Sequence, residues 1–403
     1  DPFGEGADIV TGSTHKTFFG TQRGIVSSRF TEDDVLYPFW EAVERRAFPG
    51  AVSNHHLGTL LGLLMATYEM NAFKDEYQAN VIRNAKAFAK ALKDYVQRDP
   101  RTEKAAAVNV PVHAHDKYCI DTAATRELLE EHRPELVILG KSMVLYPEPV
   151  AEMRKFIDEL GLDTFLMYDM AHVLGLIGPH FQDPFGEGAD IVTGSTHKTF
   201  FGTQRGIVSS RFEEDDVLYP FWEAVERRAF PGAVSNHHLG TLLGLLMATY
   251  EMNAFKDEYQ ANVIQNAKAY AKALKDCVLK VSGNPEVGYT QTHQVLLDVG
   301  WTKGPEIARK LEENNIIVNY QAAPEEEGFT ASGSLRMGVS EMTRFGMGPE
   351  DFGELAELVS DVVLNDATVK PRVAEFRKRF TQLGYCFNEV ELEERAGELH
   401  TLF

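Results

Sequence analysis

A 96-residue segment that occurs twice constrains the fold of this chain more than any other feature. Residues 1–96 and 183–278 align without a gap and differ at only four positions. Solenoid proteins stack many units of about 20–50 residues, whereas here two long copies flank a unique segment. A duplication, a recombined gene or a composite chain would each explain this pattern. The differing pairs are Thr31/Glu213, Arg83/Gln265, Phe88/Tyr270 and Tyr95/Cys277.

The unique segment and the residues after position 280 predict alternating strands and helices. Apolar runs at 134–140 and 164–169 are typical of strands covered on both faces, and a helical pattern ending at glycine lies between them at 149–161. This order indicates an α/β protein with a second, smaller α/β domain near its C-terminus. Further strands are expected at 189–194, 205–210, 294–300, 316–320 and 334–339, and helices at about 213–228, 237–253, 255–278, 304–315 and 349–364.

Composition limits the binding partners and the cellular compartment that we expect for this protein. The formal net charge of −20 argues against binding to nucleic acid or to an anionic membrane, because both require a basic surface. Cys119, Cys277 and Cys386 form no CxxC pair, so we expect no disulfide framework, no metal site and a reducing, cytoplasmic location. The most apolar helical run, 237–255, contains Glu251 and falls short of a membrane span.

Side chains that can take part in catalysis or ligand binding follow three of the predicted strands. Open α/β sheets bind ligands at the carboxyl ends of their strands. There a carboxylate can hold a protonated ring nitrogen, a lysine amine can form an imine, and hydroxyl groups can bind phosphate, which together are what pyridoxal phosphate requires. The alternative is an ordinary surface lysine and a turn aspartate, and spacing alone does not decide between them. The residues concerned are Ser142, Asp169, Ser195, Thr196, His197 and Lys198.

Several motifs in this order resemble one known family. The segments "YDMAHVLGLI" and "ADIVTGSTHKTFFGTQRG" are similar to the cofactor signature of the serine hydroxymethyltransferase family, a fold-type-I group of pyridoxal-phosphate enzymes. The similarity continues through "FPG" (230–232), "GYTQTHQVLLDVG" (288–300) and "SLRMGVSEMTRFGM" (334–347), and it covers about 130–403. It implies a large, mainly parallel-sheet domain and a smaller C-terminal α/β domain. We therefore divide the chain into 1–96, 97–280 and 281–403.

The resemblance also implies roles for individual residues. Lys198 would form the internal aldimine and Asp169 would pair with the pyridine nitrogen, while Arg336 would bind the amino-acid carboxylate as a bidentate fork. The implied reaction makes or breaks the Cα–Cβ bond of L-serine or L-threonine, giving a glycine quinonoid and an aldehyde. The other implied cofactor-binding residues are His172 and Ser142 near the phenolic oxygen, Ser195 and His197 near the phosphate or the aldimine, and Arg205.

Four departures from the family pattern keep alternatives open. Arg205 is displaced by one residue in "TFFGTQRGI", and "AVSNHH" (233–238) replaces an expected Gly-Gly pair. The stretches "TQTHQ" and "SNHH" resemble the L-threonine transaldolase branch. The expected amino-terminal elements (a phosphate loop, a stacking histidine, a cross-subunit tyrosine and an acidic residue) are not found in 1–130. The alternatives are therefore a transaldolase, or a catalytically incomplete relative with a scaffold role.

The two lysines in the duplicated segments are not equivalent. Lys16 and Lys198 have identical neighbours, but only Lys198 follows Asp169 and His172 and precedes Arg336. We therefore predict one pyridoxal-phosphate site, at Lys198. The family resemblance further implies an amino acid and an aldehyde as small-molecule partners and a homodimer or homotetramer, whereas a role for tetrahydrofolate has no support in the sequence.

Overall fold

The protein is described by a computed structural model that covers residues 2–15, 18–45, 61–78, 107–233, 239–324 and 332–400. The chain divides into two compact units, Asp1–Val108 and Asn109–Phe403. Lys16 lies outside the described residues, as does most of the "AVSNHH" stretch. The domain boundaries expected at 96/97 and 280/281 stay predictions.

The first unit contains a β-hairpin and helices. Strand β1 (Ile9–His15) pairs antiparallel with β2 (Phe19–Ser28), and α1 (Tyr37–Arg45) follows. Residues 61–78 are also helical. Large apolar side chains of that helix, such as Leu64, Met65 and Tyr68, are at least half exposed.

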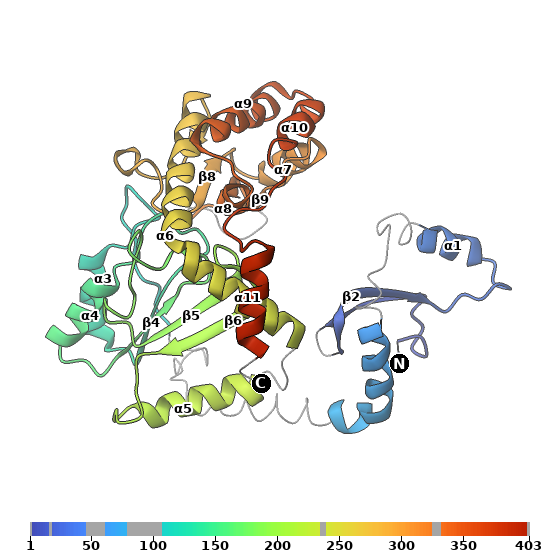
Figure 1. The fold of residues 1–403 in the computed structure, drawn as a ribbon, viewed down its shortest axis with the longest axis horizontal. Coiled ribbons are helices and arrows are strands. Elements are labelled where there is room, and N and C mark those ends of the chain that lie inside the picture. The colour runs from blue at the N-terminus through green and yellow to red at the C-terminus, as the bar shows by residue number, and fades with distance from the viewer. Residues whose placement is uncertain are drawn as a thin grey trace. The chain divides into compact units, whose positions relative to one another are not determined.

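The second unit begins with the predicted parallel sheet (Figure 1). Its strand order is β3-β4-β5-β6, with β3, β4 and β5 parallel and β6 antiparallel to β5. The apolar runs expected to form strands do so. The expectation that both faces are covered is wrong for β3, because Leu136 and Ile138 are 45% and 51% exposed. The elements are α3 (Thr122–His132), β3 (Leu136–Leu139), α4 (Val150–Glu159), β4 (Phe165–Asp169), β5 (Ile191–His197), β6 (Phe201–Ser210) and α5 (Tyr219–Arg227).

One long helix, α6 (Leu239–Asp276), leads from this sheet to the C-terminal part of the unit (Figure 1). It contacts β6 at one end and β8 and α9 further along. The two helices expected at 237–253 and 255–278 are therefore wrong, since "MNAF" contains no proline or glycine to interrupt the turn. The helix expected from 213 begins only at Tyr219, where Pro220 sits in the first turn and its fixed φ suits a helix start.

The C-terminal part has an antiparallel sheet in the order β7-β8-β10-β9. Helices α7 and α9 pack against each other, and α9 also packs on α6. Among the described residues, no helix is long and apolar enough to cross a membrane. The elements are β7 (Lys280–Val281), β8 (Gln294–Asp298), α7 (Gly304–Glu313), β9 (Asn319–Gln321), β10 (Ser334–Gly338), α8 (Ser340–Arg344), α9 (Pro349–Asn365), α10 (Lys370–Arg377) and α11 (Glu389–His400).

The duplicated sequence forms the same hairpin twice, in different surroundings. Ile9 pairs with Ser28 in the first copy, and Ile191 pairs with Ser210 in the second. In the second copy β5 also pairs with β4, which belongs to the unique segment. The unique segment therefore supplies the strand and helix against which the second copy is buried.

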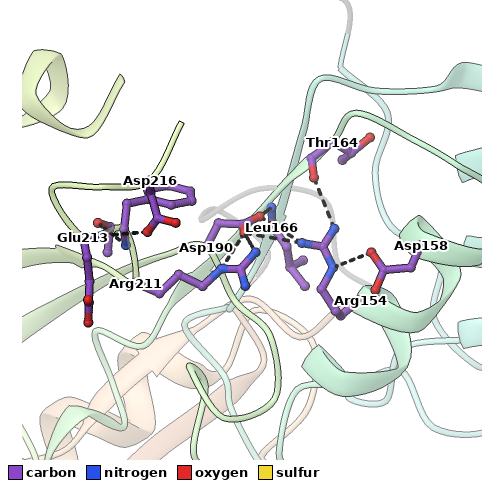
Figure 2. A network of polar contacts seen from close by, with 10 residues as sticks. Arg154, Asp158, Thr164, Leu166, Asp190, Arg211, Glu213 and Asp216 are labelled. Atoms are coloured by element: carbon purple, nitrogen blue, oxygen red, sulfur yellow. Dashed lines mark hydrogen bonds and ion pairs between the residues drawn. The ribbon is translucent and has the colours of Figure 1, made fainter. Parts of the chain in front are cut away.

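A charged network fixes the start of β5 (Figure 2). The Asp190 carboxylate is buried and accepts hydrogen bonds from Arg211 Nη2 at 2.6 Å, from Arg154 Nη1 at 3.2 Å and from the Leu166 N–H at 2.8 Å. Three elements, α4, β4 and the residue after β6, thus converge on one carboxylate. In the first unit the equivalent aspartate, Asp8, pairs with its arginine at the exposed surface.

Candidate active site

The predicted site residues of three strands meet at one edge of the parallel sheet. Asp169 ends β4, and Lys198 directly follows β5. Ser142 comes three residues after the end of β3. Gly140 between them allows a close approach, because a Cβ there would lie 2.2 Å from the Asp169 carbonyl oxygen and its φ is +115°. This edge is where the carboxyl ends of parallel strands place a ligand.

Lys198 and His172 are in direct contact. Lys198 Nζ lies 3.3 Å from His172 Nε2. Burial lowers the pKa of Lys198, the positive charge of Arg336 lowers it further, and Asp169 acts in the opposite direction. Burial also lowers the pKa of His172, to about 4, with Lys198 and Arg336 contributing. Both bases are therefore held toward their neutral forms, and a neutral amine is the nucleophilic form of lysine.

Thr199 fixes the backbone on which Lys198 sits. Its hydroxyl donates to the His172 carbonyl oxygen and accepts from the Gly175 N–H, each at 3.0 Å. The Tyr259 hydroxyl donates to the Thr199 carbonyl oxygen at 2.8 Å. Gly175 is required for this approach, because a Cβ there would lie 2.2 Å from the Thr199 carbonyl carbon. Sequence reasoning missed Thr199 and Tyr259, and the only available signal was that Thr199 directly follows the lysine.

Arg336 reaches the site from β10. Its Nη1 donates to the Ser142 carbonyl oxygen at 3.0 Å. The guanidinium is half-buried, and this burial lowers the pKa of Arg336. The remaining N–H groups of a planar guanidinium at this position can hold a carboxylate in a bidentate manner.

A cavity of about 600 Å³ connects these groups. His172, Lys198 and Arg336 form part of its lining, and Phe201 and Tyr259 contribute aromatic surface. The lining also includes His293 and Gln294. Both lie in the motif at 288–300, but the sequence did not predict a role for either. His293 stacks near His172 with ring centroids 6.3 Å apart. Its Nδ1 is buried and has no hydrogen-bond partner among the described residues, and burial lowers its pKa to about 3.

The other residues predicted to bind the cofactor do not all lie in the cavity. His197 is exposed and lines the cavity, whereas Ser195 is half-buried on the face of β5 opposite Thr196. The Ser142 hydroxyl accepts from Gln321 Nε2 at 2.5 Å. Arg205 donates to the Thr241 hydroxyl of α6 at 2.7 Å. Ser195, Ser142 and Arg205 are not part of the cavity lining.

The donor set fits the ring nitrogen and the aldehyde of pyridoxal phosphate. The Lys198 amine, with its lowered pKa, and the Arg336 guanidinium line one cavity. The Asp169 carboxylate ends β4 and is not part of that lining. The buried, unpartnered His293 Nδ1 leaves one polar atom for a ligand to satisfy. Within the part of the chain that the structure describes, no group of three or more metal-ligating side chains could hold an ion.

Comparison with known proteins identifies the family. The family described as serine hydroxymethyltransferase matches residues 1–98 and 106–359. The chain belongs to the serine hydroxymethyltransferase family. A serine hydroxymethyltransferase of Archaeoglobus fulgidus is 42% identical over 283 residues, which is 68% of this chain and 62% of that protein. One from Korarchaeum cryptofilum is 44% identical over 279 residues, 67% of this chain and 62% of that protein.

A solved structure extends the comparison to the fold. The L-threonine transaldolase from Pseudomonas fluorescens, in its internal aldimine state, matches with a TM-score of 0.63 and 32% identity over 71% of this chain and 65% of that chain. The predicted fold-type-I class is thereby confirmed. The chain spans less than two thirds of the length of these hydroxymethyltransferase relatives and of this transaldolase.

Proposed function

We propose that this chain is a pyridoxal-phosphate-dependent transferase that makes or breaks the Cα–Cβ bond of β-hydroxy-α-amino acids. The observation that carries the proposal is the grouping of Lys198, His172 and Arg336 around one cavity, with Asp169 at the adjacent strand end. Membership of the serine hydroxymethyltransferase family and the structural likeness to a transaldolase support the same reaction class.

Three of these residues have a task that follows from their position. When bound, pyridoxal phosphate supplies an electron-withdrawing ring that stabilises negative charge at Cα. Lys198, whose pKa is lowered, would hold that group through its amine, and Asp169 would hold its ring nitrogen by a charge-assisted hydrogen bond. Arg336 holds the carboxylate of the amino acid and so orients the bond at Cα that breaks.

The acceptor divides the proposal into two reactions. The curated relatives favour hydroxymethyl transfer, which predicts serine cleavage that depends on tetrahydrofolate. The transaldolase likeness favours transfer of the glycyl unit to another aldehyde, which predicts acetaldehyde release from threonine without folate. Assaying both reactions on one preparation distinguishes them, and activity in neither refutes the enzymatic proposal.

Cofactor uptake tests the assignment of the lysine. Pyridoxal phosphate held by Lys198 would colour the protein yellow, so Lys198→Ala should abolish the visible absorbance. Lys16→Ala is the matched control, because its neighbours in sequence are the same, and it should leave the absorbance unchanged. If the unaltered chain takes up no cofactor from an excess, the catalytically incomplete scaffold is the correct alternative.

We also propose that the chain assembles as a homodimer or homotetramer. Its second unit exposes large apolar side chains within one stretch of sequence, and such exposure is typical of an interaction surface. Sedimentation analysis of the full chain should give a mass above that of one chain, and a monomer at micromolar concentration contradicts the proposal. The side chains are Val217, Leu218, Phe221, Phe230, Leu239, Leu242 and Leu243.

A further inference from the structure

The Gln294 side chain, at the start of β8, is held in one orientation by two backbone groups. Its Oε1 accepts from the Val144 N–H at 2.9 Å, and its Nε2 donates to the Ser142 carbonyl oxygen at 3.1 Å. A backbone N–H can only donate and a carbonyl oxygen can only accept. These partners therefore assign the amide oxygen and nitrogen of Gln294. A flipped amide would place its NH₂ group against the Val144 N–H and its oxygen against the Ser142 carbonyl oxygen.

This orientation determines where the proton of His172 lies. Gln294 Nε2 is 3.1 Å from His172 Nδ1, and its second N–H is directed to that nitrogen. Nδ1 must therefore accept, so a neutral His172 carries its proton on Nε2. An imidazolium would bring an Nδ1–H against the amide N–H, which adds a repulsion to the cost of burying the charge.

The Nε2–H of His172 then faces Lys198 Nζ, 3.3 Å away. An ammonium has three donors and no lone pair, so it cannot accept this hydrogen bond, whereas a neutral amine can. We propose that Gln294 is a positioning residue that fixes the Nε2–H tautomer of His172 and through it keeps Lys198 Nζ unprotonated. The benefit for catalysis rests on the function proposed above, but the tautomer itself does not.

The other charged or titratable groups around His172 come from separate elements. Arg336 on β10 and Lys198 after β5 both disfavour a positive imidazole. His293 precedes β8 and stacks near the ring, and burial keeps it neutral as well. Asp169 at the end of β4 is the nearby carboxylate, and its Oδ1 accepts from the Ala171 N–H at 3.1 Å. Gln294 is only 1% exposed, and it borders the cavity.

Nitrogen NMR tests the tautomer directly. Long-range ¹H–¹⁵N correlation spectra of the full chain, labelled with ¹⁵N-histidine and without added cofactor, report which imidazole nitrogen is protonated. His172 is assigned by the signals lost in His172→Asn. We expect a protonated Nε2 and a bare Nδ1 near pH 7. A protonated Nδ1, or a charged ring, would overturn the proposal without any Gln294 variant.

Variants of Gln294 test the link to the lysine. In Gln294→Glu the carboxylate accepts from Nδ1–H, so the tautomer should reverse and Nε2 should favour an ammonium at position 198. Acetylation of Lys198 by limiting acetic anhydride at pH 8, followed by peptide mass spectrometry, should slow about tenfold, as expected when about a tenth of the amine, instead of most of it, is unprotonated. Gln294→Leu should give mixed tautomers.

Gln321→Leu is the matched control, because Gln321 contacts the Ser142 hydroxyl and should alter neither readout. An unchanged spectrum and an unchanged acetylation rate in Gln294→Glu refute the positioning role. If the chain takes up no pyridoxal phosphate but shows the Nε2–H tautomer, the proposed function fails and this inference stands.

Discussion

Replacing Asp190 by asparagine should destabilise the second unit far more than the equivalent change in the first. Asp190→Asn keeps the shape of the side chain but removes its charge and turns an NH₂ group toward donors. The carboxylate is 4% exposed and contacts Arg154, which is 17% exposed, and Arg211, which is 46% exposed. The first-unit counterparts Asp8 and Arg29 are 57% and 54% exposed.

The expected magnitudes follow from these exposures. Breaking a buried ion pair by removing one partner costs about 3–5 kcal/mol. Because solvent screens the half-exposed Arg211, we expect roughly 3 kcal/mol for Asp190→Asn, which lowers the Tm of a unit the size of Asn109–Phe403 by about 5 °C. An exposed pair contributes about 0–1 kcal/mol, so Asp8→Asn should leave the main transition within about 1 °C.

Differential scanning calorimetry of the full chain provides the comparison. Both variants carry the same chemical change in the same local sequence, so propensity and charge effects on the unfolded chain cancel between them. Salt should matter little for Asp190, because a buried pair is weakly screened. Equal shifts in the two variants, or a shift below about 1 °C for Asp190→Asn, would refute the reasoning from burial.

Three further predictions concern the site. The folded-state pKa of His172 is about 4, below its ordinary value of 6.5, so the stability it contributes is complete above pH 6.5 and is lost as the pH falls toward 4. Urea unfolding measures the free energy of unfolding at pH 7 and at pH 4.5. Its decrease between these pH values should be about 2 kcal/mol smaller in His172→Gln than in the unaltered chain. Gly175→Ala should lower the free energy of unfolding by about 1–3 kcal/mol and reduce cofactor uptake. Gly353→Ala in α9 is the control, because a Cβ there meets nothing within 4 Å, and it should raise the free energy of unfolding by about 0.5–1 kcal/mol. Tyr259→Phe should cost about 1 kcal/mol by removing the hydrogen bond to Thr199, and an unchanged denaturation midpoint would contradict that role.

Much of the site could be predicted because parallel strands impose a simple rule. Once 134–140, 164–169 and 189–194 are recognised as buried strands, their carboxyl ends must share one edge. Asp169 and Lys198 are therefore neighbours in space although 29 residues separate them in sequence. The motif around Arg336 required the family resemblance as well, since an antiparallel strand of the C-terminal sheet carries it.

Other parts of the site depend on contacts between distant segments. Gln294 meets Ser142 and Val144 from about 150 residues away, and no local pattern marks such a hydrogen bond. The guanidinium of Arg205 bonds to Thr241 on α6, a contact that depends on how that helix packs. The continuity of α6 through 254 was also missed, because amphipathic spacing changes where a helix passes from one partner to another.

The two copies of the duplicated segment show which features depend on local sequence and which depend on tertiary structure. The sequence alone determined the hairpin, since β1–β2 and β5–β6 have the same register in both copies; turn chemistry and alternation are local properties. Burial was decided by tertiary structure. Tyr259 is fully buried and Gln260 is 1% exposed, whereas their counterparts Tyr77 and Gln78 are half-buried and exposed.

The physical reason is that burial and pKa shifts require partners, and those partners belong to other segments. The second hairpin lies beside β4, with α4 and Asp169 supplied by the unique segment and Arg336 by the C-terminal sheet. Burial among these neighbours and the charge of Arg336 lower the pKa of Lys198, and Asp169 acts in the opposite direction. An identical His-Lys sequence becomes a candidate site only where the fold brings those neighbours to it.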